Sequence, residues 1–189
     1  MNLKKISLCI LGLLLTLTAH ASDLAKKLQT PDYVLLMRHA LAPGTGDPAL
    51  YNLEDCATQR NLNAEGRKQA VTIGHWLKKQ GVTTVQLYSS PWCRCKDTAA
   101  LLDFAGFKVE PALGSFFDEM QKGEQRTQAL QLFIADQTKV KGAKALILVT
   151  HHVNIFAYMG ENIGSGDMVL ARVDGAGKMV SYKILSRPH

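Results

Sequence analysis

Three short runs rich in apolar residues, each followed by a helical pattern, constrain the fold of this chain most strongly. The runs cover residues 33–37, 84–88 and 145–149. Each has the length and composition of a strand that is buried on both faces of a sheet. Strands that alternate with helices indicate an α/β domain with a mostly parallel central sheet. We therefore expect a three-layer α/β/α arrangement, with helices on both faces of the sheet.

Boundary signals place the remaining elements. Asn63 is expected to cap a helix that runs to about Lys79. Ser90 followed by Pro91 predicts the start of a second helix, which ends near Gly106. The other expected elements are a helix over 127–135, a short helix through 155–158, and strands near 167–173 and 179–185. Residues 22–31 are expected to be a polar lead-in and residues 41–62 a long loop, which is usually functional or mobile.

The first 21 residues have the layout of a secretory signal peptide. Lys4 and Lys5 precede an apolar stretch over residues 6–18, and Ala19-His20-Ala21 supplies small residues at the expected cleavage site. The stretch is short for a bilayer span, which favours a cleaved signal over the alternative of an uncleaved anchor. We expect a signal peptide over 1–21, one domain over 22–189, and a periplasmic or secreted protein with no stable membrane span.

The charge of the chain is mildly positive. The formal net charge is +6, and loss of Lys4 and Lys5 with the signal peptide would lower it by two. This balance suits anionic small molecules, but it is too weak and too dispersed to indicate nucleic-acid binding. Oligomeric state leaves no signal in the sequence.

Three cysteines follow the predicted signal peptide: Cys56, Cys93 and Cys95. Two of them could pair in an oxidising compartment, and a disulfide between Cys56 and either Cys93 or Cys95 is expected. Three unpaired thiols are the alternative. Because three cysteines without a second ligand cluster make a poor zinc site, no metal is expected.

Basic side chains stand where each of the three central strands ends. Arg38 and His39 follow the first strand, Arg94 follows the second, and His151 follows the third. Ligands of parallel sheets bind at this edge, so these side chains are expected to converge. The guanidinium fork matches phosphate oxygens, and the N-termini of the following helices favour negative charge. The pattern predicts a site for a tetrahedral phosphoryl dianion.

Four segments resemble, in order, the motifs of the histidine phosphatase superfamily, which includes the cofactor-dependent phosphoglycerate mutases. Residues 36–40, Leu-Met-Arg-His-Ala, are similar to its Arg-His-Gly signature, with Ala40 in place of the glycine. Leu62, Gly66, Gln69 and Ala70 resemble its Leu-x-x-x-Gly-x-x-Gln-Ala segment. Residues 89–94 with Thr98 and Ala99 resemble Ser-Ser-Pro-x-x-Arg-x-x-x-Thr-Ala, and residues 149–151 resemble the second histidine motif.

The resemblance implies a phosphoglycerate mutase-like fold and a mechanism without a cofactor. His39 would attack phosphorus and form a phosphohistidine, which water then hydrolyses. Arg38, Arg94 and His151 would bind the transferring phosphoryl group. The attack requires a neutral imidazole, which is available because an ordinary histidine has a pKa of about 6.5.

The residue that protonates the leaving group departs from the family pattern. Ser115 falls near the place of the family's usual glutamate, and Asp118 and Glu119 are the nearest carboxylates. Either carboxylate could donate the proton, and an ordinary solvated loop acid is an equal alternative. Arg60 and Asn61, at the end of the long loop, are expected to touch the substrate or its phosphate, with exposed loop residues as the alternative.

The leading functional hypothesis is a metal-independent phosphatase for a small phosphomonoester. A phosphohistidine phosphatase is the alternative with the same fold, and a mutase is disfavoured because the segments that would close its site are short. A weak phosphate-binding module that has lost its acid is the alternative from another class. A disulfide-linked structural protein of the envelope would explain the cysteines but not the four motifs. The sequence does not identify the substrate.

Overall fold

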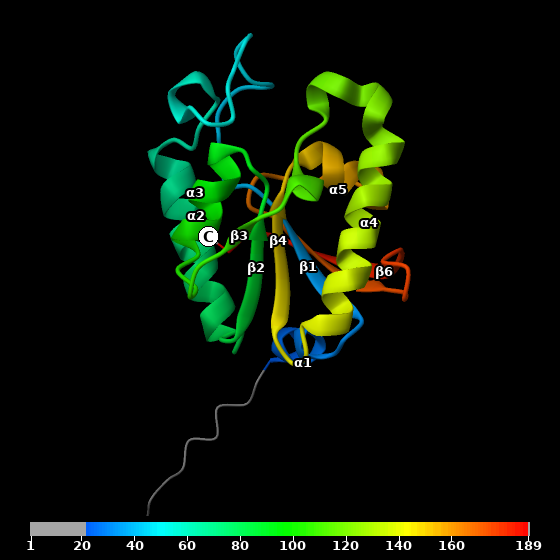
Figure 1. Cartoon of the computed structure of the whole chain (residues 1–189). Helices are drawn as coiled ribbons and strands as arrows, with labels where there is room; N and C mark the ends of the chain where they lie inside the picture. Colours follow the sequence, from blue (N-terminus) through cyan, green and yellow to red (C-terminus); the bar gives the residue numbers. More distant parts are fainter. Residues whose placement is uncertain (1–21, 189) are drawn as a thin grey trace, which may run out of the picture.

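A computed structural model describes residues 22–188 of the chain, so the predicted signal peptide lies outside the described residues. A six-stranded sheet forms the middle of three layers (Figure 1). Its strands are β1 (Tyr33–Arg38), β2 (Val85–Ser89), β3 (Lys108–Val109), β4 (Ala145–Thr150), β5 (Met168–Val173) and β6 (Met179–Leu185). The three predicted apolar runs and the two closing strands are therefore confirmed.

The strand order places the predicted site residues next to one another. The order across the sheet is β3-β2-β4-β1-β5-β6. The first four strands are parallel, and β5 and β6 are antiparallel additions beside β1. Because β4 lies between β2 and β1, the carboxyl ends of the three central strands form one continuous edge.

Alternate residues of the central strands fill two separate cores. Leu35 and Met37 pack with residues of α1 (Asp23–Gln29), α2 (Ala64–Lys79) and α3 (Cys93–Leu101). Val34 and Leu36 pack on the other face, against α4 (Gly123–Val140) and α5 (His152–Met159). All four side chains are fully buried, which is the arrangement expected for parallel strands covered on both faces. The three-layer α/β/α prediction is confirmed.

The prediction of a polar lead-in at residues 22–31 is wrong, because α1 occupies this segment. Ser22 caps the helix by accepting a hydrogen bond from the backbone N–H of Ala25. Leu24, Ala25 and Leu28 form its buried side. Positions 24, 25 and 28 lie on one face of a helix, but the two lysines between them made the segment look uniformly polar.

The predicted boundaries of two other helices also need correction. The helix α3 begins at Cys93 and ends at Leu101, later than Ser90 and earlier than Gly106. Ser90 is not the cap because its hydroxyl bonds to a histidine of the site, as described below. The helix α4 spans Gly123–Val140, well beyond the expected 127–135, because its polar outer turns continue the helix without apolar periodicity. The cap at Asn63 is confirmed.

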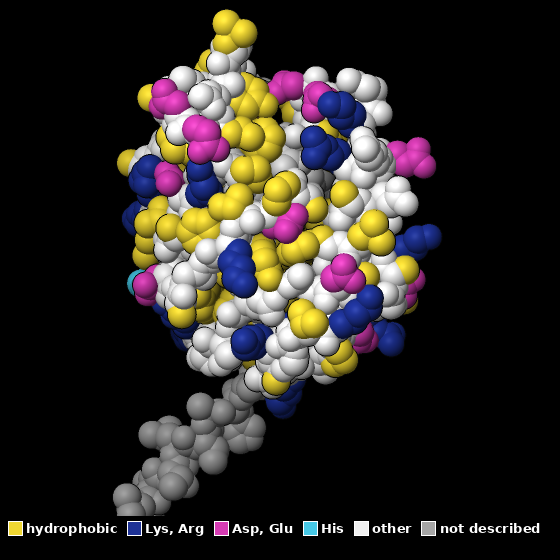
Figure 2. Space-filling model, viewed as in Figure 1, with side chains coloured by type: hydrophobic (Ala, Val, Ile, Leu, Met, Phe, Trp, Pro, Cys, Tyr) yellow, Lys and Arg dark blue, Asp and Glu magenta, His cyan; other side chains and the backbone are white. Residues whose placement is uncertain are grey.

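Two further features of the described residues concern the length of the helices and the charge of the surface. Every helix within residues 22–188 is too short or too polar to cross a membrane. On the face drawn in Figure 2, basic and acidic side chains are interspersed across the surface.

Candidate active site

A small cavity of about 130 Å³ lies at the carboxyl edge of the central strands. Its wall combines the ends of β1 and β4, the start of α3, the loop over 41–62 and the loop before α4. The lining residues are Arg38, His39, Gly44, Thr45, Gly46, Asp47, Arg60, Arg94, Ser115, Phe117, His151, His152 and Val153. The structure therefore brings together the four basic residues that the strand ends were predicted to deliver.

His39 is held in one tautomer at the end of β1. Its Nδ1 lies 2.7 Å from the carbonyl oxygen of Ala40, which can only accept a hydrogen bond. The proton therefore sits on Nδ1, and Nε2 carries a free lone pair. The ring is almost completely buried. Burial, reinforced by the positive charge of Arg94, lowers the pKa of His39 from 6.5 to about 3.

His151 is fixed by a hydrogen-bond chain across the site. Nη2 of Arg94 lies 3.3 Å from Nδ1 of His151, and because arginine only donates, this nitrogen accepts. Nε2 then carries the proton and donates it to the Ser90 hydroxyl at 2.7 Å. Burial and the charge of Arg94 lower the pKa of His151 well below its ordinary value. The His39 and His151 rings meet edge to face, with centroids 5.6 Å apart.

Two arginines in the wall retain donors without protein acceptors. Nη1 of Arg38 donates to the carbonyl of Ile163 at 2.7 Å, which orients the guanidinium. The buried Nε atoms of Arg38 and Arg94 have no hydrogen-bond partner among the described residues. Buried donors are normally satisfied, and unpaired ones beside a cavity indicate an acceptor that binds there. An anion with several oxygens meets this requirement.

Asp47 is a site residue that the sequence analysis missed. Its carboxylate oxygens lie 2.8 and 3.0 Å from Nη1 of Arg94. It also accepts from the backbone N–H of Arg60 at 3.0 Å and from the indole N–H of Trp92 at 3.1 Å. A signal was available in principle, because a buried arginine requires a carboxylate partner. Asp47 lies in a long polar loop with several acidic residues, so the sequence did not show which of them would pair with Arg94.

Arg60 lines the cavity and organises the long loop around itself. Its Nε donates to the carbonyl of Gly46 at 2.6 Å, and its Nη1 donates to the carbonyl of Ala42. Gly44 and Gly46 have φ values of 90° and 67°, which residues with side chains rarely adopt. The loop can therefore wrap around the guanidinium and present Asp47 to Arg94.

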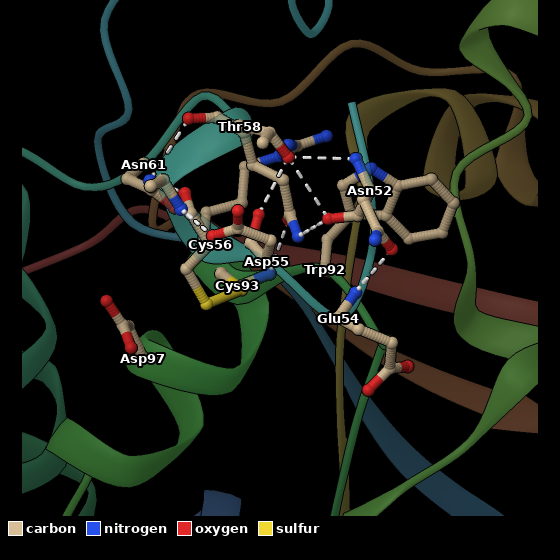
Figure 3. The surroundings of a disulfide bond; sticks show 12 residues. Asn52, Glu54, Asp55, Cys56, Thr58, Asn61, Trp92, Cys93 and Asp97 are labelled. Carbon is tan, nitrogen blue, oxygen red and sulfur yellow. Dashed lines mark hydrogen bonds between the residues drawn. A yellow bond between two sulfur atoms is a disulfide. The ribbon is translucent and has the colours of Figure 1, made fainter. Parts of the chain in front are cut away.

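A disulfide between Cys56 and Cys93 ties this loop to the first residue of α3 (Figure 3). This is one of the two pairings that the sequence left open, while Cys95 is a buried free thiol. The backbone N–H of Cys93 also donates to Oε1 of Gln59 at 2.9 Å. The bridge therefore joins the segment that carries Asp47 and Arg60 to the helix that carries Arg94.

Residues of the second and third motifs support the backbone beside His39. A Cβ atom on Gly66 would lie 2.0 Å from the carbonyl oxygen of Leu41, so only glycine allows α2 to approach so closely. Oε1 of Gln69 accepts from the N–H of Leu41 at 2.9 Å. Thr98 Oγ1 accepts from the N–H of Ala40 at 3.0 Å. These motif residues therefore act on the cavity indirectly, because they hold the backbone of residues 40–41 next to His39.

Three predicted site residues do not line the cavity. Asn61 donates to the backbone carbonyls of Cys56 and Gln59, so it stabilises the loop. Asp118 and Glu119 lie outside the lining, and Glu119 pairs with Lys122. The hydrogen bond from Lys122 lowers the pKa of Glu119, which makes this carboxyl a poorer acid near neutral pH. The assignment of a proton donor to either carboxylate stays a prediction.

The side chains that line the cavity are mostly basic and do not form a set of metal ligands. Within residues 22–188, no group of three histidine, cysteine or acidic side chains is arranged to hold a metal ion. The only carboxylate in the lining is Asp47, which is occupied by Arg94. A neutral imidazole with a free Nε2, surrounded by three arginines, is instead suited to nucleophilic attack on a bound phosphoryl group.

A three-layer domain with this basic cavity at its strand ends has the features of an enzyme that acts on phosphoryl groups. The sequence model of the histidine phosphatase superfamily (branch 1) matches residues 34–136. The chain therefore belongs to the histidine phosphatase superfamily. No curated protein sequence shows a significant match.

Solved structures of phosphatases share the fold. The protein histidine phosphatase SixA, complexed with tungstate, has 19% sequence identity and a TM-score of 0.58, covering 82% of this chain and 97% of SixA. Mycobacterial glucosyl-3-phosphoglycerate phosphatase, complexed with VO3, has 14% identity and a TM-score of 0.59, with coverage of 82% and 98%. Phosphoserine phosphatase from Entamoeba histolytica, in complex with 3-phosphoglyceric acid, has 15% identity and a TM-score of 0.57, with coverage of 79% and 95%.

Proposed function

We propose that the protein is a metal-independent phosphatase that hydrolyses a phosphomonoester through a phosphohistidine on His39. The observation that carries the proposal is the neutral imidazole of His39, with Nδ1 bound to Ala40, in a cavity where Arg38 and Arg94 keep unpaired Nε donors. A nucleophile and an oxyanion site therefore face the same small volume.

The first chemical step transfers the phosphoryl group to the histidine. Nε2 of His39 attacks phosphorus while the bond from phosphorus to the ester oxygen breaks, and the leaving oxygen takes a proton from water. Arg38, Arg94 and Arg60 stabilise the charge on the three non-bridging oxygens. The Nδ1–H bond to Ala40 remains in place and stabilises the positive charge that develops on the ring.

The second step is hydrolysis of the phosphohistidine. Water attacks phosphorus, the bond from phosphorus to Nε2 breaks, and the products are phosphate and the original neutral His39. His151 contributes through its contact with Arg94, and its Nε2–H is available to a phosphate oxygen if Ser90 releases it. No cofactor takes part in either step of the proposal.

The second candidate function is a phosphohistidine phosphatase, which cleaves a phosphorus–nitrogen bond. The observation that favours it is the absence of an unoccupied carboxylate from the lining of the cavity. The nitrogen leaving group of a phosphoramidate departs readily once it is protonated. Cleavage of a phosphoramidate therefore depends less on an acid supplied by the protein. The structure of the protein histidine phosphatase SixA shares the fold.

We also propose that the domain over residues 22–189 acts in the periplasm or outside the cell, after cleavage of the signal peptide over residues 1–21. The Cys56–Cys93 bridge is compatible with an oxidising compartment. N-terminal sequencing of the protein from a periplasmic fraction tests this proposal. A mature N-terminus at Ser22 supports it, and an intact Met1 in the cytoplasmic fraction contradicts it.

Steady-state hydrolysis of p-nitrophenyl phosphate by residues 22–189, with EDTA present, tests the proposed reaction. We expect turnover that persists with the chelator and that falls at least about a thousandfold in His39→Ala. His75→Ala is the matched control, because His75 lies exposed on α2. Activity that survives His39→Ala, or that EDTA abolishes, would overturn the proposal. Comparison with phosphoramidate as substrate separates the two candidate functions.

A further inference from the structure

A second and larger depression adjoins the phosphoryl cavity. It has a volume of about 920 Å³ and lies between the segment before α4, the start of α4, and α5. Phe117, His152 and Val153 line both the cavity and this groove. The two depressions therefore share a wall, and the groove is the nearest large space for the part of a substrate that lies beyond a phosphoryl group beside His39.

The walls of the groove are apolar where they meet the phosphoryl cavity. Phe117, Met120 and Phe156 are 44%, 62% and 44% exposed, which is unusual for three neighbouring large apolar side chains. The ring of His152 stacks on Phe156 with an interplanar angle of 11°. Nε2 of His152 lies 2.7 Å from Oδ1 of Asn162, which fixes this ring. The shared boundary thus consists of an aromatic wall and Val153.

Polar groups of the groove are distributed differently from those of the cavity. Three arginines line the cavity, whereas the only charged lining residues of the groove are Glu124 and Lys178. The hydroxyl of Thr127 is already donated to the carbonyl of Gly123 at 2.8 Å. At the shared boundary, Phe117 and Val153 offer no partner to the hydroxyl groups of a sugar, and the amides of Gln128 and Gln131 line the groove only beyond this boundary.

We propose that this groove binds an apolar leaving group, so that the substrate is an alkyl or aryl phosphate rather than a sugar phosphate. The inference rests on the proposed function, because it places the phosphoryl group beside His39. Burial of an apolar chain against Phe117, Met120 and Phe156 supplies binding energy in proportion to the area removed from water. Each methylene that enters the groove is expected to tighten binding about fourfold.

Binding of alkylphosphonates tests the groove independently of turnover, because their carbon–phosphorus bond is not cleaved by attack at phosphorus with loss of an oxygen leaving group. Calorimetry with methyl-, butyl- and octylphosphonate measures the dependence of Kd on chain length. We expect Kd to fall steadily along the series for the wild-type protein. Inorganic phosphate should displace octylphosphonate, because both occupy the phosphoryl cavity.

Two variants locate the effect in the groove. Phe156→Ala and Met120→Ala each remove an exposed side chain that lines the groove but not the cavity. We expect each to weaken octylphosphonate binding about tenfold, the effect of one to two methylenes, and to leave methylphosphonate binding unchanged. Leu132→Ala is the matched control, since Leu132 is 59% exposed on α4 and lines neither depression.

Three outcomes would overturn the inference. A Kd that does not change with chain length shows that the groove takes no apolar group. An equal loss in Leu132→Ala shows nonspecific adsorption, and tighter binding of glycerol or sugar phosphates than of octylphosphonate shows a polar leaving-group site. Failure of inorganic phosphate to bind at all would instead contradict the proposed function, so the two failures are distinguishable.

Discussion

Nη1 of Arg94 lies between the two carboxylate oxygens of Asp47, at 2.8 and 3.0 Å, and both side chains are about 3% exposed. The pair joins the start of α3 to the loop over 41–62. Its geometry leaves Nη2 of Arg94 for His151 and leaves Nε without a protein partner. Asp47 therefore acts as a positioning residue that fixes the guanidinium of Arg94 in the wall of the cavity.

Asp47→Asn tests this role. We expect kcat/KM for p-nitrophenyl phosphate to fall about a hundredfold, mainly through KM, because Arg94 loses its fixed orientation. The free energy of unfolding should drop by about 3 kcal/mol, since a buried charge loses its partner. Glu54→Gln is the control, because Glu54 is an exposed acid on the same loop. A kcat/KM that stays within twofold of the wild type would contradict the role of Asp47.

The sequence predicted the site where local pattern and topology agree, and it failed where the chain folds back on itself. Arg38, His39, Arg94 and His151 follow apolar strands, so the parallel topology alone brings them together. Asp47 becomes a site residue only because the loop curls around Arg60 and is tied to α3 by the disulfide. No periodicity marks such a residue.

The apolar groove was missed for a related reason. Phe117, Met120 and Phe156 come from two segments whose separation in the sequence hides their proximity in space. Ser90 shows a different kind of error. The Ser-Pro pair is typical of a helix start, but the Ser90 hydroxyl bonds to His151 and the helix begins at Cys93. Asp118 and Glu119 were chosen for nearness in sequence, but the segment before α4 directs Ser115 and Phe117 to the cavity.

Loss of the disulfide is expected to reduce both stability and activity. In a Cys56→Ser/Cys93→Ser variant, the free energy of unfolding should be about 4 kcal/mol lower than in the wild type. This is the loop-closure contribution expected for a sequence separation of 37 residues. Activity should fall about tenfold because Asp47 and Arg60 become less well ordered. Denaturant melts and p-nitrophenyl phosphate assays measure the two effects.

A thiol reductant provides the control for the disulfide. It should lower the activity of the wild type but leave the double variant unchanged. Burial raises the pKa of Cys95 to about 12, so this thiol should not react with alkylating agents in the folded protein. Full activity of the reduced wild type would show that the bridge does not organise the site.

The leaving group should control the rate if the site lacks a strong acid. Aryl phosphates with more acidic phenols should be hydrolysed faster, with a steep dependence of kcat on the pKa of the phenol. Glu119→Gln should change kcat less than threefold, because Glu119 pairs with Lys122 outside the cavity. Asp118→Asn tests the other predicted donor in the same assay. A hundredfold loss in either variant would identify the proton donor.

The stability of the protein should depend on pH through His39. Its pKa is about 3 in the folded state and 6.5 ordinarily, so the unfolded chain binds the proton first as the pH falls. Stability is therefore lost between pH 6.5 and pH 3, and His39 accounts for about 2 kcal/mol between pH 7 and pH 5. His39→Gln should lose that much less than the wild type over this interval.

Denaturant melts of three proteins check the pH dependence. His75→Gln, the exposed control, should lose as much stability as the wild type between pH 7 and pH 5. His151 acts in the same direction as His39, because its pKa is also lowered, so some dependence remains in His39→Gln. Equal losses in His39→Gln and the wild type would show that His39 is protonated in the folded protein at these pH values.

The central claim is that His39 carries the phosphoryl group between the two steps. Rapid mixing of residues 22–189 with p-nitrophenyl phosphate, quenching in base and peptide mass spectrometry test it most directly, because phosphohistidine survives base. The account predicts a peptide that contains His39 and has gained the mass of one phosphoryl group, with no such species in His39→Asn. Rapid turnover with no phosphorylated peptide, or with the phosphoryl group on another residue, would contradict the account.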